Sequence, residues 1–380
     1  MNPFDRIPNE ILIHILSLST HTADPGQVAS YLDRDAVFPF TSLRLCKRWR
    51  DVTRSTPEIW AAAAIVSLPE GLPRLMEHAR RCGDRPLDVS ISIVDVDIGF
   101  QAFITRLRYD RDVKLLHKIK YLRMMYREKD FYSALGTMDR VMRGLTRFGG
   151  AVLERVELFA IEWMGPPNMW DEVASLLVLV FDSQPQLRSI RLGGFRSYIP
   201  QTTSYTRSLP KLEVLVLDDC DAYIIDILSY VDIPVLHTLS ITCSGTPNPY
   251  PTASSVTMPA RIAHIPSVQR LTLIHMPTLQ DLKKVLSAVP NVRHLTLGGR
   301  WTLEAFDNEV EGFISHLESL KVMSLSTKTD MHKLKSVVAS RLGTLQAVTL
   351  DLGRGVVPDV GESEEFKWLQ EHVTLTLNAR

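Results

Sequence analysis

The sequence predicts an α/β protein in which parallel strands alternate with helices along a repeating array, preceded by a small helical module. Three observations lead to this prediction. A six-residue pattern, L-x-x-L-x-L, returns nine times from Ile119 onward, at spacings of 24–34 residues. The segments between copies place apolar residues at helical spacing, as in Thr278–Pro290. The first sixty residues carry helical patterns without this repeat.

The first predicted helix starts near Pro8 and Asn9, with Glu10 in its first turn, where a negative charge complements the helix dipole. Its apolar residues fall at positions 11, 12, 13, 15, 16 and 18, which surround most of the helix. A helix that is apolar on nearly every side must be buried on more than one side. We therefore expect it to contact both its own module and a second surface.

A second helix is predicted over about 41–54, and a third starts after the capping signal Ser55-Thr56-Pro57-Glu58. The second helix carries Leu45, Trp49 and Val52 at i, i+4 and i+7. These helices define a module at 1–64. A unit of this size has little core of its own, so its large apolar side chains need a partner, either the solenoid or another protein.

The segments IPNEILIHIL, LRLCKRWRDVTRSTPEIW and LMEHARRCGDRPLDVSI resemble the F-box-like class common in fungi, over about 1–95. The resemblance implies docking on a Skp-type adaptor, which joins a cullin scaffold and its RING subunit. It departs from compact F-boxes in the longer linker His21–Pro39. By motif match, the adaptor-binding positions are Ile7, Pro8, Ile11, Leu12, Ile15, Leu16, Leu45, Trp49 and Trp60. For each of them, packing inside the module is the alternative.

A connecting helix/strand unit at 65–118 leads into the repeats at 119–380. In each copy the fourth and sixth residues point to one side of a short strand and are expected to be buried. A strand–helix unit cannot bury its apolar face alone, so neighbouring units must stack. The nine copies begin at Ile119, Leu153, Leu187, Leu212, Leu236, Val268, Val292, Leu317 and Leu345. A doubly wound α/β sheet is the alternative, although it rarely needs so many similar strands.

The array resembles leucine-rich repeats of the longer, helix-containing kind, over roughly 85–380. Five copies also carry a proline two residues before the pattern. The Asn or Cys expected eight residues after the first Leu occurs only as Cys220, so we expect an irregular solenoid whose strand ends satisfy their backbone groups differently. With the F-box-like module, the resemblance implies a substrate receptor of a cullin–RING ubiquitin ligase. The alternative is a leucine-rich-repeat scaffold outside any ligase, with the helical module as an end cap.

In a stacked array, the strand residues that alternate with the buried positions line one open face. Their charges are mixed in sign, which favours a polar protein surface or peptide as substrate. The candidate substrate-binding residues are Glu157, Arg191, Asp218, Arg270, His294, Lys321 and Asp351. The loop Thr246–Pro259 is a second candidate contact, because insertions in solenoids often border the binding face.

Composition argues against other function classes. Lys+Arg and Asp+Glu each total 43, which gives no basic excess for nucleic acid. The longest apolar stretches are too short to cross a bilayer. Nucleotide-binding, hydrolase and metal-ligand motifs are absent from the sequence, so we expect no catalytic residues, cofactor or metal. The four cysteines are far apart, which fits a reducing compartment, and a cytoplasmic or nuclear protein is expected.

Overall fold

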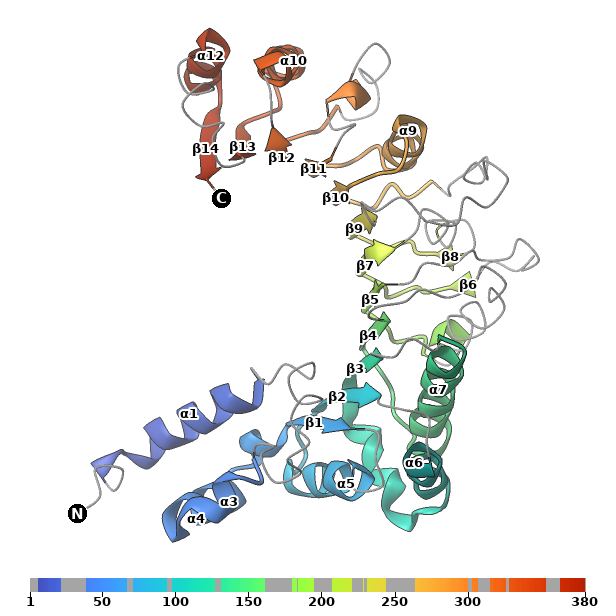
Figure 1. The fold of residues 1–380 in the computed structure, drawn as a ribbon. Helices are drawn as coiled ribbons and strands as arrows, with labels where there is room; N and C mark the ends of the chain where they lie inside the picture. Colours follow the sequence, from blue (N-terminus) through green and yellow to red (C-terminus); the bar gives the residue numbers. More distant parts are fainter. Residues whose placement is uncertain are drawn as a thin grey trace. The chain divides into compact units, whose positions relative to one another are not determined.

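The computed structural model divides the chain into two compact units, Met1–Leu187 and Arg188–Arg380 (Figure 1). The structure describes residues 6–21, 39–66, 71–93, 98–126, 131–160, 180–182, 184–194, 207–220, 228, 231–243, 264–299, 303–306, 315–325, 328–352 and 363–379. Most of the linker His21–Pro39 and all of the loop Thr246–Pro259 lie outside these residues.

The first unit contains four parallel strands in the order β1-β2-β3-β4. The strands are β1 (Ala62–Val66), β2 (Leu87–Ile93), β3 (Ile119–Tyr126) and β4 (Arg155–Ala160). The helices are α1 (Asn9–His21), α3 (Ser42–Leu45), α4 (Lys47–Ser55), α5 (Gly71–Arg81), α6 (Ile98–Tyr109) and α7 (Phe131–Arg143), with tighter or wider turns η2 (Pro57–Trp60), η3 (Arg111–Lys118) and η4 (Gly144–Phe148).

The second unit contains eight parallel strands, β5-β7-β9-β10-β11-β12-β13-β14, which pair in chain order. They are β5 (Ser189–Gly193), β7 (Val214–Cys220), β9 (Thr238–Cys243), β10 (Arg270–Ile274), β11 (His294–Gly298), β12 (Ser319–Leu325), β13 (Ala347–Leu352) and β14 (Thr374–Ala379). The other elements are β6 (Arg207–Ser208), β8 (Val231–Asp232), α9 (Leu279–Ala288), η6 (Glu304–Phe306), α10 (Lys328–Ala339) and α12 (Glu364–His372).

The strands of the second unit align the repeats position by position. Leu271 lies opposite both Leu239 and Leu295, so the fourth residues of three successive copies form one row. The fourth and sixth residues are buried from β5 to β13: Ile190, Leu192, Leu215, Leu217, Leu239, Ile241, Leu271, Leu273, Leu295, Leu297, Leu320, Val322, Val348 and Leu350. The predicted burial of these positions is confirmed.

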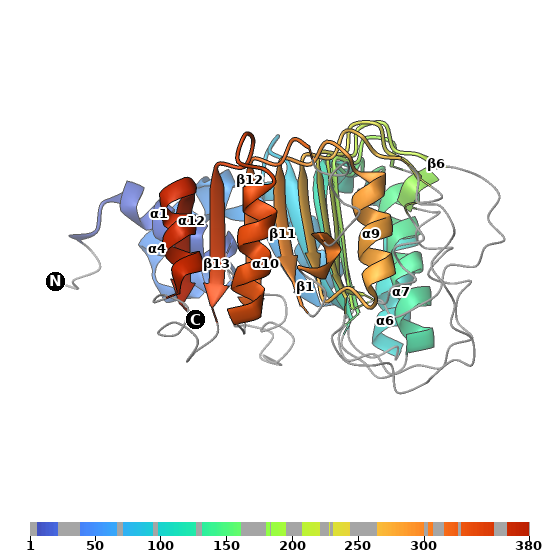
Figure 2. The same cartoon turned by 90° about the horizontal axis from the view of Figure 1, so that it is seen from above.

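The described helices of the second unit cover one side of its strands. Figures 1 and 2 show α9, α10 and α12 together on that side. The side chain of Thr278 caps α9, and Leu282, Val285 and Leu286 are buried, as their helical spacing predicted. A doubly wound sheet reverses its strand order at a switch point and carries helices on both faces. The strands from β5 to β14 pair in chain order without a reversal, and the predicted α/β class with parallel strands and helices is confirmed.

The prolines before the strands occupy a turn. In four copies, the amide of the first repeat residue donates to the carbonyl three residues earlier, as in Leu212 N to Leu209 O at 3.1 Å. Pro210 is then the second residue of the turn, where its fixed φ fits and its missing N–H costs nothing. Each copy therefore begins at a defined residue.

The strands end in a second kind of turn, at the eighth repeat position. Gly194, Asp219, His275 and Gly299 all adopt positive φ there. The amides of Gly194 and His275 donate to the carbonyls of Asp218 and Gly298 on the next strand, at 2.9 and 2.8 Å. This bond replaces the missing side-chain ladder in satisfying backbone groups.

The helical module at the N-terminus differs from the predicted three helices. The second helix divides at Cys46, whose backbone is extended, and the third shortens to the 3-10 turn η2. Proline at the start of η2 and Glu58 in its first turn agree with the predicted capping signal, whereas the predicted hydroxyl cap is wrong, because the Thr56 side chain makes no capping hydrogen bond. The chain then enters β1 at Ala62, inside the region assigned to the module, because Ala62–Val66 pairs with Asp88–Ser92 of β2.

Candidate functional site

The N-terminal helices surround a small core centred on Trp60. Its indole is fully buried and donates a 2.7 Å hydrogen bond to the carbonyl of Thr53 at the end of α4. The ring meets Phe40 and His78 edge to face, and the Arg81 guanidinium lies 4.8 Å from its centre. The buried members of this core are Leu12, Leu16, Val52, Ile59, Trp60 and Cys82.

Helix α1 has two apolar sides with different surroundings. Leu12 and Leu16 are each 1% exposed and contribute to the Trp60 core. Ile11, Ile15 and Leu18 are 51%, 41% and 52% exposed, and they recur at i, i+4 and i+7. Residues at this spacing lie on one side of a helix. The helix therefore seals the module with one side and presents a second apolar row to solvent.

The structure separates the nine predicted adaptor-binding residues into two groups. Pro8, Ile11, Ile15 and Leu45 are exposed, and Ile7 and Trp49 are half-buried. Leu12, Leu16 and Trp60 belong to the core, so they support the fold and are not available to a partner on this surface. The prediction for these three is corrected in favour of the packing alternative.

Sequence reasoning missed Leu18, which extends the exposed row of α1, and Arg48, which positions the helix. The Arg48 guanidinium donates to the Asn9 Oδ1 at 2.8 and 3.1 Å and to the Ile7 carbonyl. It thereby ties α4 to the start of α1. The spacing of Leu18 after Ile11 and Ile15 was a usable signal, whereas the contact of Arg48 spans about forty residues of sequence.

We call the strand side opposite α9, α10 and α12 the helix-free face. Four of the predicted substrate-binding residues form two ion pairs on it, in the same diagonal arrangement. Arg191 bonds Asp218 through Nε at 2.7 Å, and Lys321 Nζ lies 3.1 Å from Asp351 Oδ2. In both, the fifth residue of one copy meets the seventh of the next. Asp351 is buried and also accepts from Asn378 at 2.7 Å, so this pair is the better fixed.

Arg270 differs from these charges. It is exposed on β10, between Thr238 of β9 and His294 of β11 in the strand register. Within the part of the chain that the structure describes, no acid forms an ion pair with it. His294 is half-buried and its Nδ1 lies 2.9 Å from the Ser319 hydroxyl. The Arg270 guanidinium is thus available to an acidic group from outside.

Glu157 lies in the first unit and is buried among cations. Its carboxylate accepts from Tyr121 at 2.8 Å and Arg155 at 2.6 Å, and Arg123 lies 3.6 Å away. Burial, together with the hydrogen bond to Glu157, raises the pKa of Tyr121. With its oxygens engaged inside the chain, Glu157 is a structural residue, and its predicted role as a direct substrate contact does not fit this geometry.

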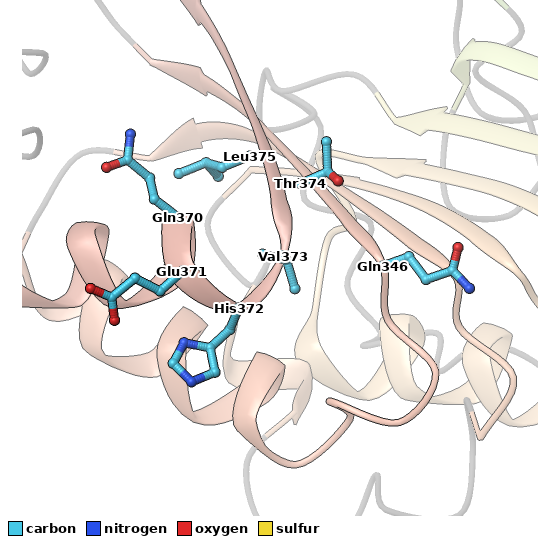
Figure 3. A pocket seen from close by; sticks show the side chains of 7 residues that line it. All are labelled: Gln346, Gln370, Glu371, His372, Val373, Thr374 and Leu375. Atoms are coloured by element: carbon cyan, nitrogen blue, oxygen red, sulfur yellow. The ribbon is translucent and has the colours of Figure 1, made fainter.

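A pocket of about 570 Å³ lies where α12 leads into β14 (Figure 3). Its walls come from α12, β14 and the residue before β13: Gln346, Gln370, Glu371, His372, Val373, Thr374 and Leu375. His372 bonds the Trp368 carbonyl of its own helix at 2.8 Å and stacks on the Trp368 ring. These contacts engage the His372 Nδ1 and one face of its ring within its own helix.

The described residues also bear on metal sites and membrane spans. Among them, no three His, Cys, Asp or Glu side chains gather as metal ligands would. None of the described helices combines the length and apolarity that crossing a bilayer requires. Comparison with protein-family models, curated proteins and solved structures finds no match. The residues and their geometry therefore carry the functional proposal.

Proposed function

We propose that this chain is the substrate-recognition subunit of a Skp–cullin–F-box ubiquitin ligase. The exposed row of α1 and the exposed Leu45 of α3 dock on the Skp-type adaptor, and the helix-free face of the repeats binds a protein substrate. The receptor contributes no reacting group. It holds the substrate near the conjugating enzyme and raises the effective concentration of the acceptor lysine.

The observation that carries this proposal is the second apolar side of α1. Exposed apolar rows on a helix mark a surface that enters a groove of a partner. The sequence of α1 and α4 resembles the F-box-like motif, whose partner is such an adaptor. The parallel repeats, with one side that carries none of the described helices, resemble leucine-rich repeats that select substrates.

The end-cap alternative has some support, since Leu12 and Leu16 cover the core next to β1. A cap needs one apolar side, however, and its outer side should be polar. Ile11, Ile15 and Leu18 do not fit that requirement. The ligase proposal explains both sides of the helix, and the cap explains one.

Changing Ile11 and Ile15 together to alanine should weaken adaptor binding about a hundredfold. Each truncation at the centre of an interface typically costs more than 1 kcal/mol, and every 1.4 kcal/mol is a factor of ten. Both side chains are exposed, so the fold should be unaffected. Titration calorimetry with a purified Skp-type adaptor measures the change, and circular dichroism checks the fold.

Glu10→Ala is the matched control, because Glu10 is exposed on the same helix and lies to one side of the apolar row. It should bind like the wild type. Equal binding by the folded double variant would refute the docking row. A wild-type chain that does not bind any Skp-type adaptor would refute the ligase proposal and leave the scaffold.

Arg270→Glu should remove captured substrate while adaptor binding stays intact. The substituted carboxylate would repel an acidic group that the guanidinium attracts, and we expect about a tenfold loss of capture. Affinity purification with quantitative mass spectrometry from the native cell measures this as depletion of partners other than adaptor and cullin.

Lys367→Glu provides the control, since Lys367 is exposed on α12, outside the helix-free face. It makes the same change of charge and should retain the partners. If Arg270→Glu retains every such partner, substrates bind elsewhere on the chain. The single variant is preferable to a triple reversal with Arg191 and Lys321, because those two already hold ion pairs.

A further inference from the structure

Strand β14 is the last of the paired strands in the second unit. Two of its residues stand at repeat positions that are buried in the other copies, but here they are partly exposed. Among the described strands it pairs with β13 alone. Leu375 and Leu377 lie opposite Val348 and Leu350, which are fully buried. Leu377 is nevertheless 41% exposed and Leu375 is half-buried. The pattern that forms the core elsewhere therefore reaches solvent at this edge.

The terminal strand of the first unit, β1, differs from β14 because its inward side chains are buried. Its inward residues Ala63 and Ile65 are each 3% exposed. The helices α5 and α1 and the turn η2 contact this strand. A covered edge is the usual state of a sheet in a monomer, since an open edge offers unpaired N–H and C=O groups to other chains. The open edge of β14 thus calls for a partner strand.

The strand has none of the features that keep edges apart. Proteins protect edges with lysine, proline, bulges or inward charges. The sequence of β14, TLTLNA, contains no charge and no proline, and it pairs with β13 without a bulge. Its alternating Thr and Leu suit a strand with one apolar side. The backbone of β14 is therefore ready to continue a ladder.

The alternation of apolar and polar residues in β14 is the same in both directions around Thr376. Antiparallel pairing of two copies about Thr376 sets Leu375 against Leu377 and Thr374 against Asn378. Apolar side chains then meet apolar ones, polar meet polar, and no like charges oppose each other. A contact between identical surfaces related by a two-fold axis requires this self-complementarity.

We propose that β14 joins two copies of this chain edge to edge, in antiparallel register, with Thr376 on the two-fold axis. The two-fold axis stands perpendicular to the strands, so the four leucines gather on the side that carries α12 in both copies. They cover one another and restore the burial that their counterparts in β13 have. The pocket in Figure 3, lined by Thr374 and Leu375, borders this contact. This inference does not depend on the proposed function.

The test uses the full chain and three variants at position 376. Light scattering after size exclusion and sedimentation over a concentration series should show a dimer for the wild type. Thr376→Lys and Thr376→Glu each place two like charges on the axis, and each should raise the dissociation constant about tenfold or more. An equimolar mixture of the two variants should recover the dimer, because opposite charges then meet. Thr376→Ser should remain a dimer.

Thr272→Lys is the control, since Thr272 occupies the same repeat position on β10, away from the edge. Thr376 is exposed, so circular dichroism should be unchanged in all variants. A wild type that is monomeric at about 100 μM, where even weak specific pairs assemble, overturns the proposal. Equal self-association of Thr376→Lys, or no recovery in the mixture, also overturns it.

Discussion

Replacing Trp60 with alanine should lower the free energy of unfolding of the first unit by about 4 kcal/mol, within the range for buried aromatic-to-alanine changes. The indole is fully buried, and the substitution leaves a cavity among Leu12, Leu16 and Ile59. It also leaves the Thr53 carbonyl without its donor. Urea denaturation followed by far-ultraviolet circular dichroism measures the loss.

Trp60→Phe separates the two contributions. It keeps most of the ring and removes the N–H, so we expect it to retain more than half of the stability that Trp60→Ala loses. Because the chain has two compact units, the transition of the first should shift while that of the second stays in place. A loss below about 1 kcal/mol for Trp60→Ala would contradict a core centred on this residue.

Acidification should destabilise the first unit through His78, by about 3 kcal/mol between pH 7 and pH 4. Burial lowers the pKa of His78 to about 4, against the opposing effects of its contact with the Trp60 carbonyl and of the Glu77 charge. The unfolded chain takes up a proton near pH 6.5, whereas the folded chain takes it up only near pH 4. Unfolding therefore binds a proton in this window, and the free energy of unfolding falls as the pH falls.

His78→Gln isolates this effect. Glutamine can donate to the Trp60 carbonyl, as the His78 Nδ1 does at 3.1 Å, but it does not titrate. Carboxylates that protonate in the same range are common to both proteins, so the difference between their stability curves reports His78. We expect the curves to diverge between pH 6.5 and pH 4. Parallel curves would show that His78 is solvated in the folded chain.

The positions of Trp60 and His78 also show that the N-terminal module does not fold apart from the strands that follow it. Trp60 and His78 join the helices to α5 and β1, so the module and the first strands form one folding unit. A protein truncated after residue 64 would lose Cys82 and His78 from the core. Adaptor-binding experiments should therefore use the full chain.

The sequence by itself determined the strands. Each copy of L-x-x-L-x-L contains its own period of two, and its fourth and sixth residues are buried wherever neighbours stack. All nine copies coincide with strands β3 to β13, and the copies near Leu87 and Val373 coincide with β2 and β14. Local sequence also determines where α9 starts and how long it is, since Thr278 caps it and Leu282, Val285 and Leu286 share one side.

Only the tertiary structure decided which residues of the module face a partner. Helix α1 is apolar nearly all round, so its own sequence leaves the rotation about its axis open. The Trp60 core selects Leu12 and Leu16 and leaves Ile11 and Ile15, one residue away, in solvent. A tertiary contact also shortens the third predicted helix, because pairing with β2 makes Ala62–Val66 a strand. The pairing of Arg191 with Asp218, and the absence of a described ion-pair partner for Arg270, depend on register between strands far apart in sequence. Local patterns carry no information about such long-range contacts, since the free energy that settles them arises only when the elements meet.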